Sequence, residues 1–269
     1  MPFLPAVDPT IISLIRDDLQ LTTWLSLGAC LQSFLILLLP AKYAMLPAAA
    51  VVGYRFTKTA LMTVGLIHDT TQDKVLQGRF TAQLPPVGSE QKKADEEMVV
   101  FIIGARSNHP LSRFAPGFLK AGDYFQSMWK EAETNRATSG YLGRSSDMLA
   151  TDDQTGNAII TLSYWKSMAH LHAFARSAAH QAGWQWFNKV TKTHPHLGMM
   201  HEVYAIPKGH WENIYKNITP FGMGQIQRLV EGGKEASGEE VLLSQLVPAV
   251  GNRWQSMKTR MAWTGELQD

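Results

Sequence analysis

Residues Met98–Ala105 read MVVFIIGA and residues Ala158–Trp165 read AIITLSYW, and these two runs decide the fold. Both are continuous in apolar residues and rich in β-branched side chains. Runs of this length are typical of strands that are buried on both faces. They predict the central strands of a sheet with a layer packed on each side.

The segments around these strands complete a regular order of elements. Apolar residues recur at helical spacing over 111–135 and 166–192, and strands are expected over 140–148, 200–206 and 211–218. The order strand, helix, strand, strand, helix, strand, strand predicts an α+β fold, a ferredoxin-like βαββαβ unit with one added strand. One face of such a sheet carries the helices. We expect the other face to pack on a second copy, giving a homodimer of the dimeric α/β-barrel type.

The rest of the chain differs in character from this domain. We expect a hydrophobic N-terminal helical segment over 1–68, a polar linker over 69–97, the ferredoxin-like domain over 98–224 and an irregular tail over 225–269. The linker is assigned from its two prolines and its charged cluster, and the tail from the polar stretch EGGKEASGEE.

The N-terminal segment predicts attachment to a membrane. No charged residue lies between Asp18 and Lys42, and Leu21–Pro40 is long enough to cross a bilayer as a helix. Tyr43–Tyr54 is also uncharged but short, so it favours a re-entrant or interfacial half-helix. The expected location is an intracellular membrane of the endoplasmic-reticulum type. The alternative is a pair of buried helices that pack on the rest of the chain.

Composition excludes several classes of protein. Of 269 residues, 25 are Lys or Arg and 23 are Asp or Glu, so the net charge of +2 does not predict a nucleic-acid partner. The single cysteine, Cys30, excludes an intrachain disulfide and a thiolate zinc cluster. Nucleotide-binding glycine motifs, the G-x-S-x-G nucleophile motif and H-E-x-x-H are absent, which removes most support for a hydrolase, an ATPase or a zincin.

His201 is the first candidate for chemistry, because it lies within a predicted strand. Alternation places His201 with Val203 on one face, and Glu202 with Tyr204 on the other. An imidazole that faces an apolar cavity can act as a haem ligand, a general base or a proton shuttle. The alternative is a core histidine bonded to a carbonyl group.

Further candidates lie on neighbouring elements. We expect catalytic roles for His201, Glu202, Asn213 and Tyr215, and substrate contacts from Arg106, Trp165, Tyr204, Trp211 and Asn217. The row from Trp211 to Asn217 on alternate positions of one strand suits either a ligand cavity or a dimer interface. Trp165 is also consistent with a core residue, and Arg106 with a salt bridge.

Three stretches carry a resemblance to a known family: MVVFIIGARSNHPL from Met98, LSYWKSMAHLHAFAR from Leu162 and HEVYAIPKGHWENIYKNITPFGMG from His201. They resemble a fungal and bacterial family of unknown-function domains whose fungal members are called monooxygenases of secondary-metabolite clusters. That family is similar to the antibiotic-biosynthesis monooxygenases and, more remotely, to haem-containing aldoxime dehydratases.

The resemblance implies a monooxygenase that oxidises a bulky, lipophilic terpenoid or polyketide intermediate. In a cofactor-free reaction with molecular oxygen His201 would be the base, while Asn213, Tyr215 and Asn217 would orient the enolate. In a haem enzyme His201 would be the axial ligand and Glu202 would fix its orientation. The alternatives are a non-oxidative dehydratase, isomerase or cyclase, and a binding module without catalysis, the latter expected if Trp165, Trp211 and Tyr215 fill the cavity themselves.

Overall fold

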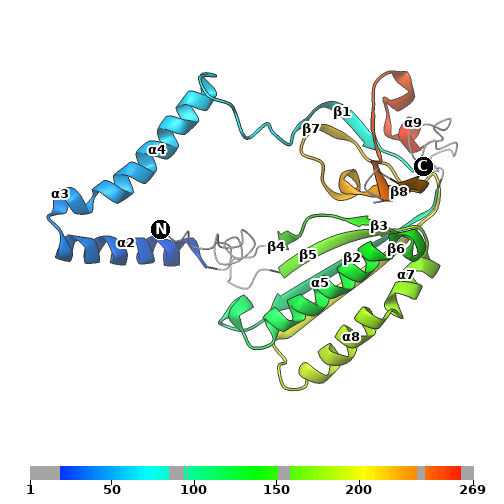
Figure 1. The fold of residues 1–269 in the computed structure, drawn as a ribbon, viewed down its shortest axis with the longest axis horizontal. Helices are drawn as coiled ribbons and strands as arrows, with labels where there is room; N and C mark the ends of the chain where they lie inside the picture. Colours follow the sequence, from blue (N-terminus) through cyan, green and yellow to red (C-terminus); the bar gives the residue numbers. More distant parts are fainter. Residues whose placement is uncertain (1–18, 85–93, 95, 151–157, 235–239, 262–269) are drawn as a thin grey trace, which may run out of the picture. The chain divides into compact units, whose positions relative to one another are not determined.

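A computed structural model describes residues 19–84, 94, 96–150, 158–234 and 240–261 (Figure 1). The chain divides into two compact units, Met1–Val75 and Leu76–Asp269. The boundary falls immediately before the first strand, β1, Leu76–Ala82.

The described part of the first unit is helical. It consists of α2 (Leu21–Leu38), α3 (Ala41–Ala44) and α4 (Leu46–Thr63). Neither α2 nor α4 has a buried residue. Among the described residues, α2 alone is both long and apolar enough to cross a membrane, with a mean hydropathy of 1.7. The Gln32 side chain donates hydrogen bonds to the Ala44 carbonyl (3.1 Å) and the Met45 sulfur (3.3 Å), which links α2 to the turn after it.

The second hydrophobic helix is longer than the sequence predicts. A half-helix was expected to end near Tyr54, but α4 continues through Arg55 and Lys58 to Thr63. Pro47 lies in the first turn of α4, where a missing N–H breaks no helical hydrogen bond. Pro47 is therefore compatible with the start of α4 and does not interrupt the helix.

The second unit contains the predicted ferredoxin-like arrangement. Its strands are β2 (Met98–Ser107), β3 (Tyr141–Arg144), β4 (Met148–Ala150), β5 (Ala158–Trp165) and β6 (Leu197–Ile206). They form an antiparallel sheet in the order β3-β5-β2-β6, with β4 also paired to β5. Both apolar runs that decide the fold are central strands, as predicted.

Helices cover one face of this sheet (Figure 1). They are η1 (Ser112–Phe114), α5 (Phe118–Thr134), α6 (Arg136–Ser139), α7 (Met168–Ala175) and α8 (Ala178–Val190). Gly183 allows α8 to approach α5 closely, because a Cβ atom there would lie 2.1 Å from the Met128 methyl group. The core below the helices is aromatic and includes Trp129, Tyr141, Trp165 and Phe174.

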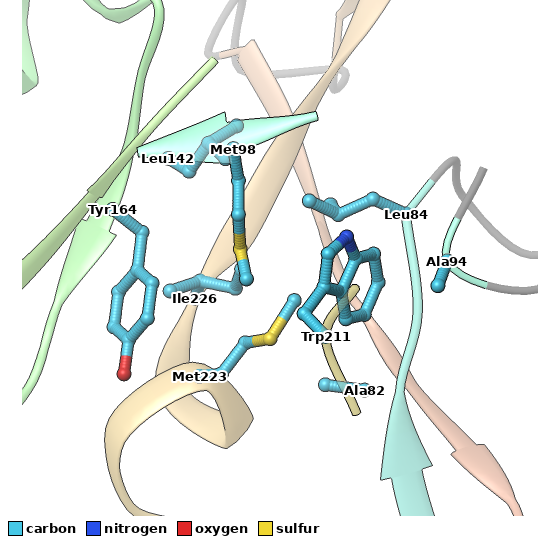
Figure 2. Close-up of a cluster of buried hydrophobic side chains, with 9 residues drawn as sticks. All are labelled: Ala82, Leu84, Ala94, Met98, Leu142, Tyr164, Trp211, Met223 and Ile226. Atoms are coloured by element: carbon cyan, nitrogen blue, oxygen red, sulfur yellow. The ribbon is translucent and has the colours of Figure 1, made fainter. Parts of the chain in front are cut away.

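A second core lies on the opposite face of the sheet. Figure 2 shows Met98 and Met223 between Tyr164 and Trp211. This core also receives Ala82 and Leu84, which lie at and just after the end of β1, so part of the face that was expected to meet a second copy is covered by the chain itself.

Parts of the expected linker and tail fold as strands and short helices. The prediction of a polar linker and an irregular tail was therefore wrong. The expected linker contains β1, and the expected irregular tail contains β8 (Gln227–Lys234), β9 (Glu240–Ser244) and β10 (Leu246–Pro248), followed by η3 (Asn252–Trp254) and α9 (Met257–Met261). Strands β8 and β9 pair with each other, whereas β1 lies between β10 and β7 (Tyr215–Ile218) in a three-stranded sheet. The strand expected as an addition to the ferredoxin-like sheet is therefore β7, and it belongs to a different sheet.

Candidate functional site

The predicted row from Trp211 to Asn217 lies against β1, where its side chains take part in packing and hydrogen bonding. Only Tyr215–Ile218 is a strand, and the side chains before and within it bond to β1. The Asn213 side chain accepts a hydrogen bond from the Ala82 N–H (2.6 Å) and donates one to the Ala82 carbonyl (3.1 Å). Asn217 has a φ of 49°, and its side-chain oxygen accepts from the Gly78 N–H (2.8 Å). Both amides hold β1 in place, and in Asn213 both the oxygen and the nitrogen of the side chain are used for this.

Both tryptophans assigned to substrate binding lie in the two cores. Trp165 is fully buried on the helix side, and its indole N–H donates to the Ser163 hydroxyl (3.0 Å). Trp211 is 5 % exposed on the other side, and its N–H donates to the Glu96 carbonyl (2.9 Å). These positions agree with the expected alternative in which tryptophans complete the core.

Tyr215 meets a second tyrosine that the sequence analysis did not select. Burial raises the pKa of Tyr164 to about 12, with a further contribution from Tyr215, while the Met223 N–H lowers it. Burial likewise raises the pKa of Tyr215, opposed by the Gly224 N–H. The 3-10 turn η2 (Gly222–Gln225) packs closely against both tyrosines through its two glycines. A Cβ at Gly222 would lie 3.1 Å from the Tyr164 hydroxyl, and one at Gly224 would lie 2.9 Å from the Tyr215 ring.

His201 lies on β6, the edge strand of the ferredoxin-like sheet. It is opposite Ile103, and Val203 is opposite Phe101, so both face the helix side as the alternation predicts. The imidazole lies 5.6 Å from the Phe101 ring, centroid to centroid, and is exposed to solvent. On the other face, the Tyr204 hydroxyl donates to the Glu202 carboxylate, which raises the pKa of Tyr204. Glu202 is therefore bonded to Tyr204 and does not orient His201.

The structure brings a second histidine toward His201. His180 lies in the first turn of α8, with its ring 5.5 Å from the Phe174 ring. Its Nδ1 atom is buried and has no hydrogen-bond partner among the described residues. Burial lowers the pKa of His180, a backbone hydrogen bond at Ala175 and the Glu131 carboxylate oppose this shift, and the nearby His201 lowers the pKa further. No periodic pattern connects this position to His201, because His180 belongs to a helix and His201 to a strand 21 positions later.

A polar cavity lies at the opposite edge of the sheet. Its volume is about 310 Å³, and it is lined by Glu133, Arg144, Ser145, Ser146 and Gln225. The Arg144 guanidinium lies 5.7 Å from the Trp129 ring and is paired with Asp147 (3.0 Å). Arg106, which was expected to contact the substrate, does not line this cavity; it is opposite Gly198 on the edge strand β6.

The residues around His201 in one copy do not fit a haem. A haem iron site needs an axial ligand inside an apolar pocket that encloses the ring and controls access to the iron. His201, Glu202, Val203 and Tyr204 are all exposed on the edge strand, with Val203 38 % and Tyr204 50 % accessible. The chemistry open to His201 here is that of an accessible imidazole with a second imidazole, His180, near enough to interact with it electrostatically.

Residues 98–223 match the family described as Monooxygenase af470-like. This match covers just under half of the chain and contains β2 through β7, His180 and His201. It confirms the resemblance that the sequence predicts.

A curated protein called Monooxygenase af470, from Aspergillus fumigatus strain Af293, is 28 % identical over 252 residues. The alignment covers 92 % of this chain and 89 % of that protein, so the shared region extends beyond the ferredoxin-like unit into the hydrophobic helices and the C-terminal strands. The family match and this relative together support an oxidoreductase role of the monooxygenase type for the chain.

Solved structures with similar folds include an aldoxime dehydratase in complex with butyraldoxime, with 14 % identity and a TM-score of 0.37 over 55 % of this chain. The chain spans about two fifths of the length of that dehydratase. SnoaB, a cofactor-independent oxygenase from Streptomyces nogalater, has 11 % identity and a TM-score of 0.24, covering 40 % of this chain and 91 % of its own.

Proposed function

We propose that the chain is a monooxygenase that oxidises a bulky, apolar intermediate of secondary metabolism by a cofactor-free reaction with dioxygen. The observation that carries the proposal is His201, an accessible imidazole within the region that matches a monooxygenase family, and His180 of α8 lies near enough for His201 to lower its pKa. Apolar side chains surround it on β6 and β2, including Val203 and Phe101, and provide a surface for an apolar ring system.

The reaction assigned to this site balances without an external reductant. His201 removes a proton from an activated CH₂ group, and the resulting carbanion combines with dioxygen to form a peroxide anion, to which the protonated His201 returns its proton to give a hydroperoxide. His201 then removes the remaining proton on that carbon while the O–O bond breaks, and it delivers this proton to the departing hydroxide. One oxygen atom stays in the ketone and the other leaves as water. Because the pKa of His180 is lowered, this second imidazole repels the protonated His201 less than an ordinary histidine would.

The proposed working form is a homodimer associated with a membrane. Strand β6 has an unpaired edge in the described chain and exposes Met199, Met200 and Val203, which favours contact with a second copy. Helix α2 would anchor the protein, because it is long and apolar enough to cross a bilayer and none of its residues is buried. An anchor of this kind places the enzyme where lipophilic substrates accumulate.

Oxygen uptake by the full chain in detergent tests the reaction, with anthrone as the probe because it is an apolar ring system with an enolisable CH₂ group. We expect consumption of one O₂ per ketone formed and one labelled oxygen atom in the product from ¹⁸O₂. His201→Ala should lower the rate by about 10²–10⁴-fold, the usual contribution of a general base.

His172→Ala is the matched control, since His172 lies on α7, is exposed and is outside the site. Its rate should equal that of the wild type. An undiminished rate in His201→Ala would refute the assignment of the base, and conversion of a substrate without oxygen uptake would favour the non-oxidative alternative.

A further inference from the structure

The N-terminal helical unit has an unusual distribution of charge. Between Asp18 and Asp69 the chain has three charged residues, Lys42, Arg55 and Lys58, and all three are basic. They follow α2 in the chain, so they would lie on the side of a bilayer where the C-terminal end of α2 emerges. A run of 50 residues without an acidic side chain is suited to an anionic partner.

Helix α4 has the composition of a helix that lies in a membrane interface. Arg55 and Lys58 lie on one side at helical spacing, and Phe56 and Ala60 point away from them. Phe56 is 78 % exposed, so its apolar side has no partner within the described part of the unit. Basic residues on one side and an aromatic residue on the other are typical of helices at the boundary between headgroups and acyl chains.

A second crossing by α4 is disfavoured by the position of its charges. The helix has 18 residues, and Arg55 and Lys58 are its tenth and thirteenth, close to the middle. A crossing would place both near the centre of the bilayer, where charged side chains are costly and rare. At the interface the same two residues reach the headgroups while the apolar side remains in contact with lipid.

We propose that Lys42 and the basic side of α4 bind the headgroups of anionic phospholipids in the leaflet where α2 emerges. This inference rests on the membrane anchoring proposed above and extends it to the type of lipid. The cytoplasmic leaflet is the negatively charged one, and loops that carry Lys and Arg remain on that side. The unit Leu76–Asp269, which follows α4 in the chain, would then be on the cytoplasmic side.

A competition between two kinds of vesicle tests the proposal. The full chain is synthesised in a cell-free system that contains equal amounts of phosphatidylcholine vesicles and of mixed phosphatidylcholine–phosphatidylserine vesicles with different densities. The measured quantity is the ratio of protein bound to the two kinds of vesicle. Because both have the same hydrocarbon interior, insertion of α2 contributes equally to each and does not change this ratio. Each basic residue at a charged surface contributes about fivefold to binding, so we expect a preference for the anionic vesicles that approaches a hundredfold and falls as salt is added.

The variant Lys42→Gln/Arg55→Gln/Lys58→Gln should bind both vesicles nearly equally. Its control, Lys120→Gln/Lys130→Gln/Lys208→Gln, removes the same charge from exposed positions in the second unit and should keep the preference. Equal binding of the wild type to both vesicles, or a preference retained by the first variant, would overturn the proposal and leave the anchor intact. Binding to neither vesicle would overturn both, without bearing on the oxygen uptake that tests the enzyme.

Discussion

Replacing Asn213 with alanine should destabilise the protein without removing a catalytic group. The Asn213 side chain bonds both the N–H and the carbonyl of Ala82, a residue with no solvent exposure. The substitution leaves these two backbone groups unpaired in a closed environment. A buried unpaired polar group costs about 1–3 kcal/mol, so with two such groups the free energy of unfolding should fall by about 2–6 kcal/mol. For a domain of this size the midpoint of thermal unfolding should fall by about 5–15 °C.

Thermal unfolding of the full chain in detergent, followed by tryptophan fluorescence, measures this effect. Lys216→Ala, at an exposed position on the adjacent strand β7, is the control and should shift the midpoint by little. Oxygen uptake per folded molecule, measured well below the midpoint, should be unchanged in Asn213→Ala. A variant with normal stability and strongly reduced turnover would refute the structural role and restore the catalytic one that the sequence suggests.

Three further substitutions probe the core, the backbone and the histidine pair. Trp165→Ala should cost about 3–5 kcal/mol in urea unfolding, because Trp165 is fully buried in the aromatic core; a loss below about 1 kcal/mol would contradict that packing. Gly140→Ala should lower the free energy of unfolding by at least about 1–2 kcal/mol, because Gly140 has a φ of 64° and a Cβ there would lie 2.3 Å from the His170 ring. Its control, Gly122→Ala, is at an open position of α5 and should be neutral or stabilising. Because the pKa of His180 is lowered in the folded protein, the unfolded chain binds a proton at this residue more readily than the folded chain does. The free energy of unfolding should therefore fall as the pH drops below the ordinary histidine value of 6.5. In unfolding titrations between pH 5 and 8, His180→Gln should weaken this pH dependence.

The ferredoxin-like unit could be predicted because its elements carry local signals. Strands β2 and β5 are continuous apolar runs, and the helices between them show regular spacing. Each of these patterns arises from burial by immediate neighbours in the sheet or the helical layer. The order of the elements then leaves few arrangements, and the observed order β3-β5-β2-β6 is the one expected for this fold.

The three-stranded sheet could not be predicted in the same way. Strand β1 reads LQGRFTA, with a glycine, an arginine and a glutamine among seven residues, and its partners β7 and β10 are four and three residues long. Their pairing is non-local, since Phe80 is opposite Tyr215 on one side and Pro248 on the other. Part of the ladder is completed by the side chains of Asn213 and Asn217. Short, polar strands stabilised by side-chain amides leave no periodic pattern in a sequence.

The difference between local patterns and non-local packing also explains why the sequence predicts His201 as a site residue and does not predict His180. Alternation within one strand places His201 and Val203 on the helix side, and the register with β2 agrees. His180 reaches that region through the packing of α8 on α5, which depends on Gly183 and on the Glu131 carboxylate that accepts from Ser177 (2.7 Å) and from the Ala179 N–H (3.0 Å) at the start of α8. The position of His180 thus depends on a helix cap and a glycine contact. If His180 acts with His201, Glu131→Gln, which weakens the cap and removes a charge that raises the pKa of His180, should lower the rate of oxygen uptake together with the stability of α8. A loss of stability with unchanged turnover would show that the cap and His180 do not contribute to the reaction.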